Sequence, residues 1–392
     1  MYVDLTPEQL VLRDELRAYF ARLMTPELQE ELRSGGEGGG PLYRKALRQM
    51  GADGWLGIGW PKEYGGQGRS PVEQFIFADE IQRVGYPIPF LTLNTVGPTL
   101  MRFGTESQRK EFLPRILRGE LHFSIGYSES GAGTDLASLT TQAVREGDEF
   151  VINGQKVFTS LADFADYIWL AARTDPNAPK HKGISIFMVS TQSPGFKLTP
   201  IWTVSGVRTN VTYFENVRVP AEMLIGQENE GWSLIVNQLN HERVSLLPVG
   251  PFSRVFEEIQ QWAGETKLAD GRRVIDRPWV RAHLARVHAK LEVLKLMQWK
   301  QAWAMTRGTL QPADASAVKV YGSEFFVEGY RLLMEVVGPL STIPADSECT
   351  VIRGRLEHLY RTALILTFGG GTNEVQRDII AMAGLGMPNY KR

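Results

Sequence analysis

A carboxylate lies on an apolar stripe of an expected helix. The stretch "LIVNQLNHERVSLL" has helical spacing, and Ile235, Leu239 and Leu246 fall on one face at steps of four and seven residues, with Glu242 between them. Burying an unpaired carboxylate is expensive. Glu242 is therefore either paired, with Arg243 or a more distant cation, or has a raised pKa and acts as an acid or a base. Buried acids are usually paired for structural reasons, and this stretch alone leaves both interpretations open.

A second candidate site is a glycine-rich stretch that follows an expected strand, "GYSESGAGTDLAS". Its small residues and the hydroxyls of Ser128 and Thr134 would let the backbone approach a flat, phosphate-bearing ligand and offer N–H donors to it. The spacings G-x-x-x-x-G-K-[ST] and G-x-G-x-x-G of the common nucleotide loops are absent, so a nucleotide would have to bind in another way. The alternative is an ordinary glycine-rich bend in a β domain.

Near the end of the chain, "LTFGGGTNEVQRDII" joins three glycines to the expected start of a helix. Exposed N–H groups and the helix dipole favour an anion at such a place. His241, beside Glu242, is a lone histidine and is interpreted as structural. No paired Cys or His cluster has the spacing of a metal site, so no metal is expected.

The elements that position these residues change type twice along the chain. Residues 1–120 have helical patterning and open with the capping box "TPEQ", residues 121–231 contain short runs rich in β-branched and aromatic residues, and residues 232–392 are helical again. The turn signals in the middle part are "EGDE" and "NG". We therefore expect three domains in the order helical, β, helical.

The composition is that of an ordinary globular protein. The chain has 392 residues with 43% hydrophobic residues, a net charge of −1 and a pI near 6.6, and it has no block of Lys and Arg that would follow a nucleic-acid backbone. Its single cysteine, Cys349, cannot form an internal disulfide, and no apolar run is long enough for a membrane span. These features predict a soluble, cytoplasmic protein that does not bind nucleic acid.

Five segments together resemble the acyl-CoA dehydrogenase family, in the family's order and over nearly the whole chain: "PKEYGGQG", "FGTESQRKEFLPRILRGE", "YSESGAGTDLAS", "FENVRVP" and "GGGTNEVQRDII". The resemblance implies a mainly α fold with a central β domain, made of an N-terminal helical domain, a middle β-barrel and a C-terminal four-helix bundle. It also implies FAD held between these domains.

The same resemblance assigns cofactor contacts. The hydroxyl of Ser128 is expected to hydrogen-bond the flavin ring, and a phenylalanine in "KVFTS" replaces the family's tryptophan against that ring, with loss of the indole N–H. Thr134 corresponds to a position near the ligand phosphates and the pantetheine. The full set of expected cofactor-binding residues is Ile125, Tyr127, Ser128, Gly133, Thr134, Phe158, Ser160, Thr372 and Glu374.

The family removes a proton alpha to a thioester while a hydride leaves the beta carbon. Most members place the base, a glutamate, two residues before the threonine of the closing segment, where this chain has Gly370. In the branch that resembles isovaleryl- and long-chain-acyl-CoA dehydrogenases, the base comes from an "ER" pair on a bundle helix, and Glu242 has that position. The resemblance thus implies that Glu242 is catalytic and that Thr134, Asn240, His241 and Arg243 contact the acyl-CoA substrate.

Two departures concern the assembly. The family's "R-x-x-F-G" segment has no counterpart, and its "Q-x-x-G-G" segment reads "EVVGP", which places Glu335 and Pro339 where Gln and Gly are usual. A carboxylate near the flavin pyrophosphate would repel it. A paralogous chain is therefore expected to supply these contacts in an α2β2 tetramer. The chain resembles the actinobacterial heterotetrameric acyl-CoA dehydrogenases of steroid degradation; a homo-oligomer is the alternative.

The resemblance implies a bulky, steroid-like or branched acyl group and electron transfer to an electron-transfer flavoprotein. Gly97, in "TLNTVGPTL", either leaves width for fused rings or is an ordinary helix-packing site, and packing is the favoured interpretation. Alternatives for the whole chain are a non-catalytic partner subunit, an acyl-CoA oxidase and a flavin monooxygenase of the same fold.

Overall fold

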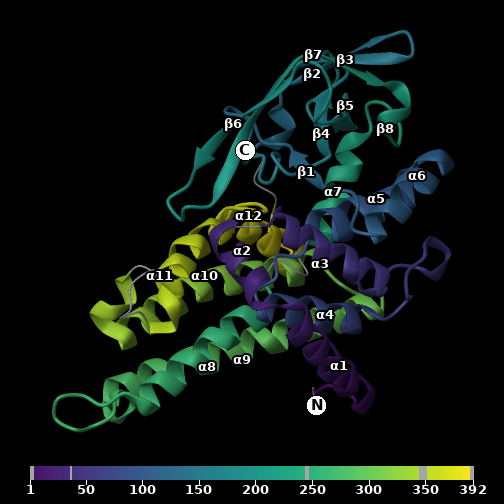
Figure 1. The fold of residues 1–392 in the computed structure, drawn as a ribbon. Coiled ribbons are helices and arrows are strands. Elements are labelled where there is room, and N and C mark those ends of the chain that lie inside the picture. Colours follow the sequence, from purple (N-terminus) through teal and green to yellow (C-terminus); the bar gives the residue numbers. More distant parts are fainter. Residues whose placement is uncertain (1–3, 36–37, 243–246, 344–350, 389–392) are drawn as a thin grey trace.

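The computed structural model describes residues 4–35, 38–242, 247–343 and 351–388, and within them it does not describe the side chains of residues 34, 35, 237, 239–242 and 353. A β domain forms one end of the molecule, and helices from both ends of the chain pack together below it (Figure 1). The expected order of helical, β and helical parts is confirmed.

The N-terminal part begins with the expected capping box. The side chain of Thr6 accepts a hydrogen bond from the backbone N–H of Gln9 at 3.3 Å, and the Gln9 side chain accepts one from the N–H of Thr6 at 3.0 Å. Helical spacing then buries Leu12, Leu16 and Phe20 on one face. The helices of this part are α1 (Pro7–Leu23), α2 (Pro26–Gly35), α3 (Pro41–Ala52), α4 (Pro71–Arg83), α5 (Gly97–Phe103) and α6 (Glu106–Leu117).

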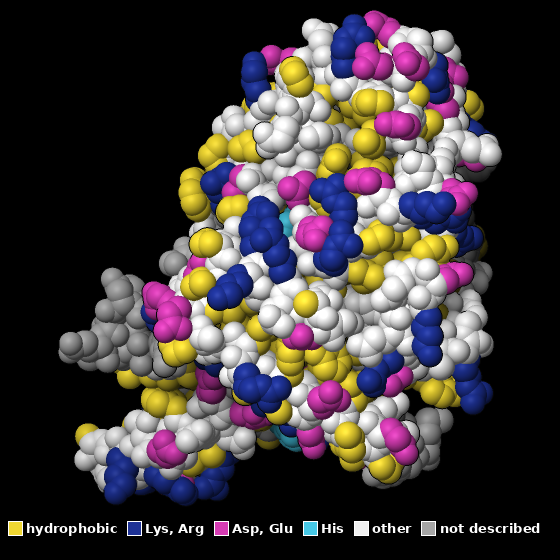
Figure 2. All heavy atoms as spheres, turned by 45° about the vertical axis from the view of Figure 1, so that its right-hand side comes forward, with side chains coloured by type: hydrophobic (Ala, Val, Ile, Leu, Met, Phe, Trp, Pro, Cys, Tyr) yellow, Lys and Arg dark blue, Asp and Glu magenta, His cyan; other side chains and the backbone are white. Residues whose placement is uncertain are grey.

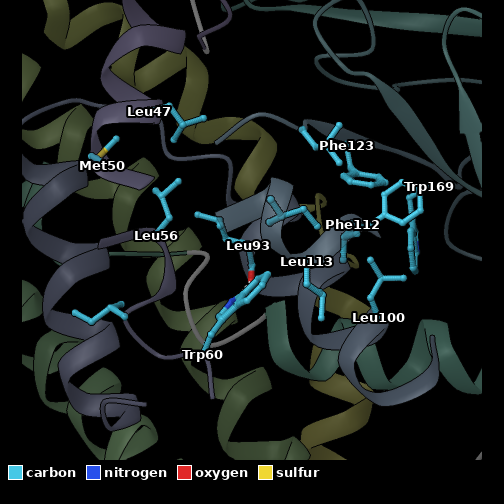
Figure 3. Packing of buried hydrophobic residues seen from close by; sticks show 14 of the residues in the cluster. Leu47, Met50, Leu56, Trp60, Leu93, Leu100, Phe112, Leu113, Phe123 and Trp169 are labelled. Carbon is cyan, nitrogen blue, oxygen red and sulfur yellow. Dashed lines mark hydrogen bonds between the residues drawn. The ribbon is translucent and has the colours of Figure 1, made fainter. Parts of the chain in front are cut away.

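Gly97 is a packing site. A single π-helical turn, η3 (Thr92–Val96), precedes it, and a Cβ at Gly97 would lie 2.1 Å from Cζ2 of the Trp60 ring. The indole N–H of Trp60 donates to the carbonyl of Leu93 at 3.0 Å, which fixes the ring against this turn (Figure 3). The space that the missing side chain leaves is occupied by Trp60 and is not available to a substrate ring.

The β domain is one mixed sheet of eight strands in the order β6-β7-β3-β2-β4-β5-β8, with β1 paired in parallel to the first half of β4. Because β1 ends beside Leu170 of β4, the chain leaves the sheet at Tyr127. The strands are β1 (Phe123–Gly126), β2 (Gln142–Glu146), β3 (Glu149–Lys156), β4 (Tyr167–Arg173), β5 (Ile184–Ser190), β6 (Phe196–Trp202), β7 (Arg208–Pro220) and β8 (Leu224–Ile225).

One of the two turn signals was interpreted correctly. "EGDE" forms the turn between β2 and β3, where Gly147 has φ +66°. "NG" is not a turn, because it lies within β3 at a register shift against β7. Gly154 has φ +147° there, and a Cβ on it would lie 2.6 Å from the hydroxyl of Thr141, so this glycine allows a bulge.

The C-terminal part contains α7 (Gly231–Glu242), α8 (Val249–Glu265), α9 (Pro278–Thr306), α10 (Pro312–Val337), α11 (Arg355–Ala363) and α12 (Asn373–Ile379). Helix α8 is held to the N-terminal part by Asp79 of α4, whose carboxylate accepts a hydrogen bond from the N–H of Gly250 at 2.6 Å. Burial raises the pKa of Asp79 to about 6. The two helical parts are thus joined at the first turn of α8.

The largest apolar core runs from the N-terminal helices into the sheet. Phe112 of α6 packs edge-on against Phe123 of β1, and Phe123 lies edge-on against Trp169 of β4 (Figure 3). This continuity fixes the position of β1 relative to the helices. Across the part of the chain that the structure describes, none of the helices is both long and apolar enough to cross a bilayer.

Candidate functional site

Three hydrogen bonds join β1 and the residues just after it to the end of β3 and the segment that follows. The N–H of Val157 donates to the carbonyl of Ser128 at 2.8 Å, the ammonium of Lys156 donates to the carbonyl of Tyr127 at 3.1 Å, and the hydroxyl of Ser124 donates to the carbonyl of Ser160. The expected cofactor-binding residues Ile125, Tyr127, Ser128, Phe158 and Ser160 are therefore brought together. Ile125 and Ser128 are half-buried and Tyr127 is buried.

A buried ion pair anchors the glycine-rich loop that follows. Glu129 accepts from Lys156 Nζ at 2.8 Å, from the N–H of Thr141 at 2.9 Å, and from the N–H and hydroxyl of Thr140, both at 2.7 Å. Burial acts to raise the pKa of Glu129, but the charge of Lys156 and these hydrogen bonds outweigh it and hold the pKa at about 2. Burial lowers the pKa of Lys156 to about 8, so both groups are charged at neutral pH.

Beyond this anchor the loop is open. Gly133 and Thr134 are exposed, and a Cβ built on Gly131 or Gly133 would meet no described atom within 4 Å. Neither glycine is required by a neighbouring side chain in this structure. The exposed backbone of this loop would allow the close approach of a ligand.

Phe158 has an unusual conformation. Its φ is +59°, in the left-handed region that bulky residues avoid, and its side chain is 64% exposed. The hydroxyl of Ser160, two residues on, lies 3.1 Å from that of Thr209 on β7. An apolar ring displayed at the surface beside hydroxyl groups suits the face of a flat aromatic ligand.

Helix α7 is attached to the end of β1 through Gln238. Tyr127 Oη donates to Gln238 Oε1, and Trp169 Nε1 lies 3.3 Å from the same oxygen. Because an indole N–H can only donate, the orientation of the amide is fixed. Gln238 is 1% exposed, and its Nε2 has no hydrogen-bond partner within the described ranges. This amide comes one helical turn before Glu242, the last residue of α7.

The candidate catalytic and substrate-binding group on α7 is described only in part. The backbone of Asn240, His241 and Glu242 belongs to α7, but their side chains are not described, and Arg243 lies outside the described residues. Of the apolar stripe, Ile235 is fully buried.

The closing glycine segment is held by Lys319 of α10. Its ammonium donates to the carbonyls of Thr367 and Gly371, at 3.2 and 2.7 Å, and to Asn373 Oδ1 at 2.7 Å. Gly371 has φ +92°, and a Cβ on it would lie 2.7 Å from the amide nitrogen of Gln376. Local folding explains this glycine without a ligand. Lys319 is 2% exposed and was not singled out in the sequence.

Thr372 and Glu374 begin α12, as expected for a helix start after the glycines. Thr372 is the N-cap residue and accepts from the N–H of Val375 at 3.3 Å. Glu374 is exposed, and hydrogen bonds at this helix start lower its pKa. These two residues belong to the C-terminal part, whereas Phe158 belongs to the β domain. One link between the two parts is the hydrogen bond that Arg361 of α11 donates to the carbonyl of Val204, at the tip of the β6–β7 hairpin.

Glu335 does not present an uncompensated charge. Its carboxylate lies 2.7 Å from His283 Nε2 on α9 and 2.5 Å from Arg331, which is on α10 together with Glu335. Acidic and basic side chains are also interspersed on the face of the molecule that Figure 2 shows. The repulsion expected from the replacement of Gln by Glu at this position is therefore reduced within the chain.

Several residues that build the site were missed in the sequence: Gln238, Trp169, Lys156, Glu129 and Lys319. A polar residue one turn before Glu242 on the same helix, and a lysine at the end of a strand, were the available signals. Gln238, Trp169, Lys156 and Glu129 are buried and support the end of β1 and the glycine-rich loop, and Lys319 supports the closing glycine segment. The exposed Phe158 ring and the open face of Gly133 are the groups that would meet a flat ligand carrying phosphates.

Comparison with known proteins gives consistent matches over the whole chain. Models of acyl-CoA dehydrogenase domains match residues 6–120 (N-terminal domain), 124–217 (middle domain) and 229–385 (C-terminal domain). Acyl-CoA dehydrogenase FadE26 of Mycobacterium tuberculosis is 55% identical over 400 aligned positions that cover 100% of both chains.

Two solved assemblies contain similar chains. A chain of the ChsE4-ChsE5 complex from Mycobacterium tuberculosis is 55% identical with a TM-score of 0.94, and the match covers 100% of each chain. A chain of the Tcur3481-Tcur3483 steroid ACAD is 51% identical with a TM-score of 0.94, again over 100% of each chain.

Proposed function

Because this chain belongs to the acyl-CoA dehydrogenase family, we propose that it oxidises the bond between the alpha and beta carbons of an acyl-CoA thioester, with FAD as cofactor. The observation that carries the proposal is the link from the end of β1 to α7. Tyr127 Oη and Trp169 Nε1 both bind Gln238, one turn before Glu242. A base at the end of α7 would thereby be held against the strand that is expected to contact the flavin.

The carboxylate of Glu242 takes the proton from the alpha carbon in this proposal, and Thr134, Asn240, His241 and Arg243 bind the thioester substrate. FAD, when bound, supplies the acceptor for the hydride that leaves the beta carbon. A carboxylate in a dry site has a raised pKa, which brings it closer to that of the alpha proton. Gly370 offers no side chain for this task, which leaves Glu242 as the candidate base.

We propose flavin contacts for nine residues. The hydroxyl of Ser128 and the backbone of Ile125 and Tyr127 would bind the ring, and Phe158 would cover one face. Ser160 and the exposed Gly133–Thr134 loop would meet the phosphate side, where Thr372 and Glu374 of α12 would complete the site. The open space at Gly133 and the exposed ring of Phe158 support this assignment.

We further propose that the active form contains a second, different acyl-CoA dehydrogenase chain and that the acyl group is steroid-like. Similar chains occur in the ChsE4-ChsE5 complex and in the Tcur3481-Tcur3483 steroid ACAD, which supports both points. The missing "R-x-x-F-G" segment agrees with a partner that supplies flavin contacts. Electrons would then pass to an electron-transfer flavoprotein.

The test is anaerobic mixing of the protein, alone and with a coexpressed paralogous chain, with straight-chain, branched and steroid acyl-CoAs while the visible flavin absorbance is followed. Bleaching by a steroid acyl-CoA is expected. Glu242→Gln should lower the bleaching rate at least about a hundredfold and leave flavin bound. Glu265→Gln, on the exposed end of α8, is the matched control and should bleach normally.

The outcomes separate the alternatives. If Glu242→Gln bleaches at the wild-type rate, Glu242 is not the base. If no acyl-CoA bleaches the flavin with or without a partner, the chain is a non-catalytic subunit. Fast reoxidation of the reduced flavin by oxygen would identify an oxidase or monooxygenase. If the protein alone forms a homotetramer that holds one tightly bound flavin per chain, the proposal of a second, different chain is refuted.

A further inference from the structure

The segment that carries Phe158 is strained and is held from two sides. Within residues 157–163, here called the Phe158 loop, Phe158 has φ +59° and Leu161 has φ +62°. Two large apolar residues in the left-handed region within four positions persist only where surrounding contacts fix the backbone. On the side of β1, Val157 donates to the carbonyl of Ser128, and Ser124 donates to the carbonyl of Ser160. The contacts from β7 are more numerous.

Asn210 of β7 is the centre of these contacts. It is fully buried, its carbonyl accepts from the N–H of Thr159 at 2.9 Å, and its Nδ2 donates to the carbonyl of Thr159 at 3.1 Å. The same Nδ2 lies 3.3 Å from Asp163 Oδ1. One side chain and its own backbone therefore bind both the residue after Phe158 and the end of the loop.

Other residues of β7 extend the clamp. Arg208 forms an ion pair with Asp163 at 2.9 Å, Thr209 lies 3.1 Å from the hydroxyl of Ser160, and Thr212 lies 3.2 Å from that of Thr159. β3 pairs with β7 as far as Lys156 and Thr212, so the loop that follows β3 begins beside the first residues of β7. The loop backbone is bound on both sides, whereas the ring of Phe158 remains 64% exposed.

We propose that Asn210, together with the ion pair of Arg208 with Asp163, is a positioning device that holds the Phe158 loop in its strained form and so presents the Phe158 ring to the flavin before the flavin binds. The inference rests on the proposed function for the identity of the ligand. It goes beyond that function because it assigns the preformed ring surface to β7 of this chain. A buried amide is suited to this task because its NH2 group donates to two oxygens at fixed angles and carries no charge.

The first test needs no cofactor. Chymotrypsin cleaves after accessible phenylalanine in mobile segments, so the exposed Phe158 of the apo protein should resist cleavage while the clamp is intact. Asn210→Leu should increase the rate of cleavage after Phe158 at least tenfold, as followed by mass spectrometry. Asn153→Leu is the matched control, because Asn153 also bonds across the sheet, to Asn216 at 2.9 and 3.1 Å, but at an exposed site away from the loop.

The second test asks whether Asn210 acts through the ring. Flavin affinity and the visible spectrum of bound flavin are measured for Phe158→Ala, Asn210→Leu and the double variant, each with the coexpressed partner. Asn210→Leu should weaken flavin binding about as much as Phe158→Ala, and the double variant should be no worse than Phe158→Ala. Asn210→Asp, which replaces the donor by a carboxylate facing two oxygens, should behave like Asn210→Leu.

Equal cleavage rates for wild type and Asn210→Leu would overturn the clamp, and additive losses in the double variant would overturn its action through Phe158. If the wild-type protein binds no flavin but the cleavage test succeeds, the proposed function fails and the clamp stands. These two failures are therefore distinguishable.

Discussion

Replacement of Lys156 by methionine removes the buried ion pair with Glu129 and leaves the exposed side chains of the site unchanged. The side chain of Lys156 is fully buried and that of Glu129 is 7% exposed, so the ion pair lies out of contact with water. Methionine has a similar length and fills the space, but it leaves the Glu129 carboxylate without its counter-ion. The carbonyl of Tyr127 also loses its donor.

The expected loss in the free energy of unfolding depends on the hydrogen-bond donors that Glu129 keeps. Breaking a buried ion pair by removing one partner costs about 3–5 kcal/mol. Glu129 keeps three further donors, from Thr140 and Thr141, and these continue to solvate its charge. We therefore expect a loss near the lower end, about 3 kcal/mol in the free energy of unfolding.

The assay is urea unfolding at neutral pH, followed by intrinsic tryptophan fluorescence and by circular dichroism. The double variant Lys156→Met with Glu129→Gln removes both charges and should recover about 1–2 kcal/mol relative to Lys156→Met alone. Lys197→Met is the matched control. It breaks a 2.7 Å ion pair with Glu215 that is exposed on both sides, in the same domain, and should change stability little.

The reasoning would be refuted by a loss below about 1 kcal/mol for Lys156→Met, because the pair would then contribute no more than an exposed one. It would also be refuted if the double variant lost more free energy of unfolding than the two single variants lose together. That result would mean that the hydrogen bonds, and not the charges, hold the loop.

Three further predictions follow from single contacts. Gly97→Ala should destabilise the N-terminal part by about 1–3 kcal/mol in thermal unfolding, because its Cβ would meet the Trp60 ring at 2.1 Å, and recovery of stability in Gly97→Ala with Trp60→Phe would support that cause. Burial lowers the pKa of His122 to about 4, so the unfolded state binds more protons between pH 6.5 and 4 and stability is lost as the pH falls through this window. His122→Gln should therefore make the melting temperature depend less on pH in this window. An unchanged dependence would exclude His122 as the cause. Lys319→Met should lower the free energy of unfolding by at least about 2 kcal/mol, because the carbonyls of Thr367 and Gly371 and the side chain of Asn373 lose a buried donor. The purified variant should also contain less flavin. An unchanged flavin content would mean that this segment does not belong to the cofactor site.

The local patterns were sufficient for the order of the domains and for several element boundaries. The capping box at Thr6, the turn at Gly147 and the helix start at Thr372 are each formed by residues within a few positions of one another. Such contacts depend on backbone geometry that is the same in any fold, so a sequence alone specifies them. Where local signals conflicted, as at Gly154, the sheet register decided between turn and bulge.

The family motifs in the sequence predicted which residues belong to the candidate site, but not which residues hold them. Tyr127 and Gln238 are 111 positions apart, Thr159 and Asn210 are 51 apart, and Asp79 caps a helix 171 positions away. These partners are determined by strand register and helix packing, which no local periodicity encodes. Tertiary structure alone showed that Trp60 fills the space beside Gly97, that Glu335 is paired, and that the strained Phe158 loop is clamped by β7.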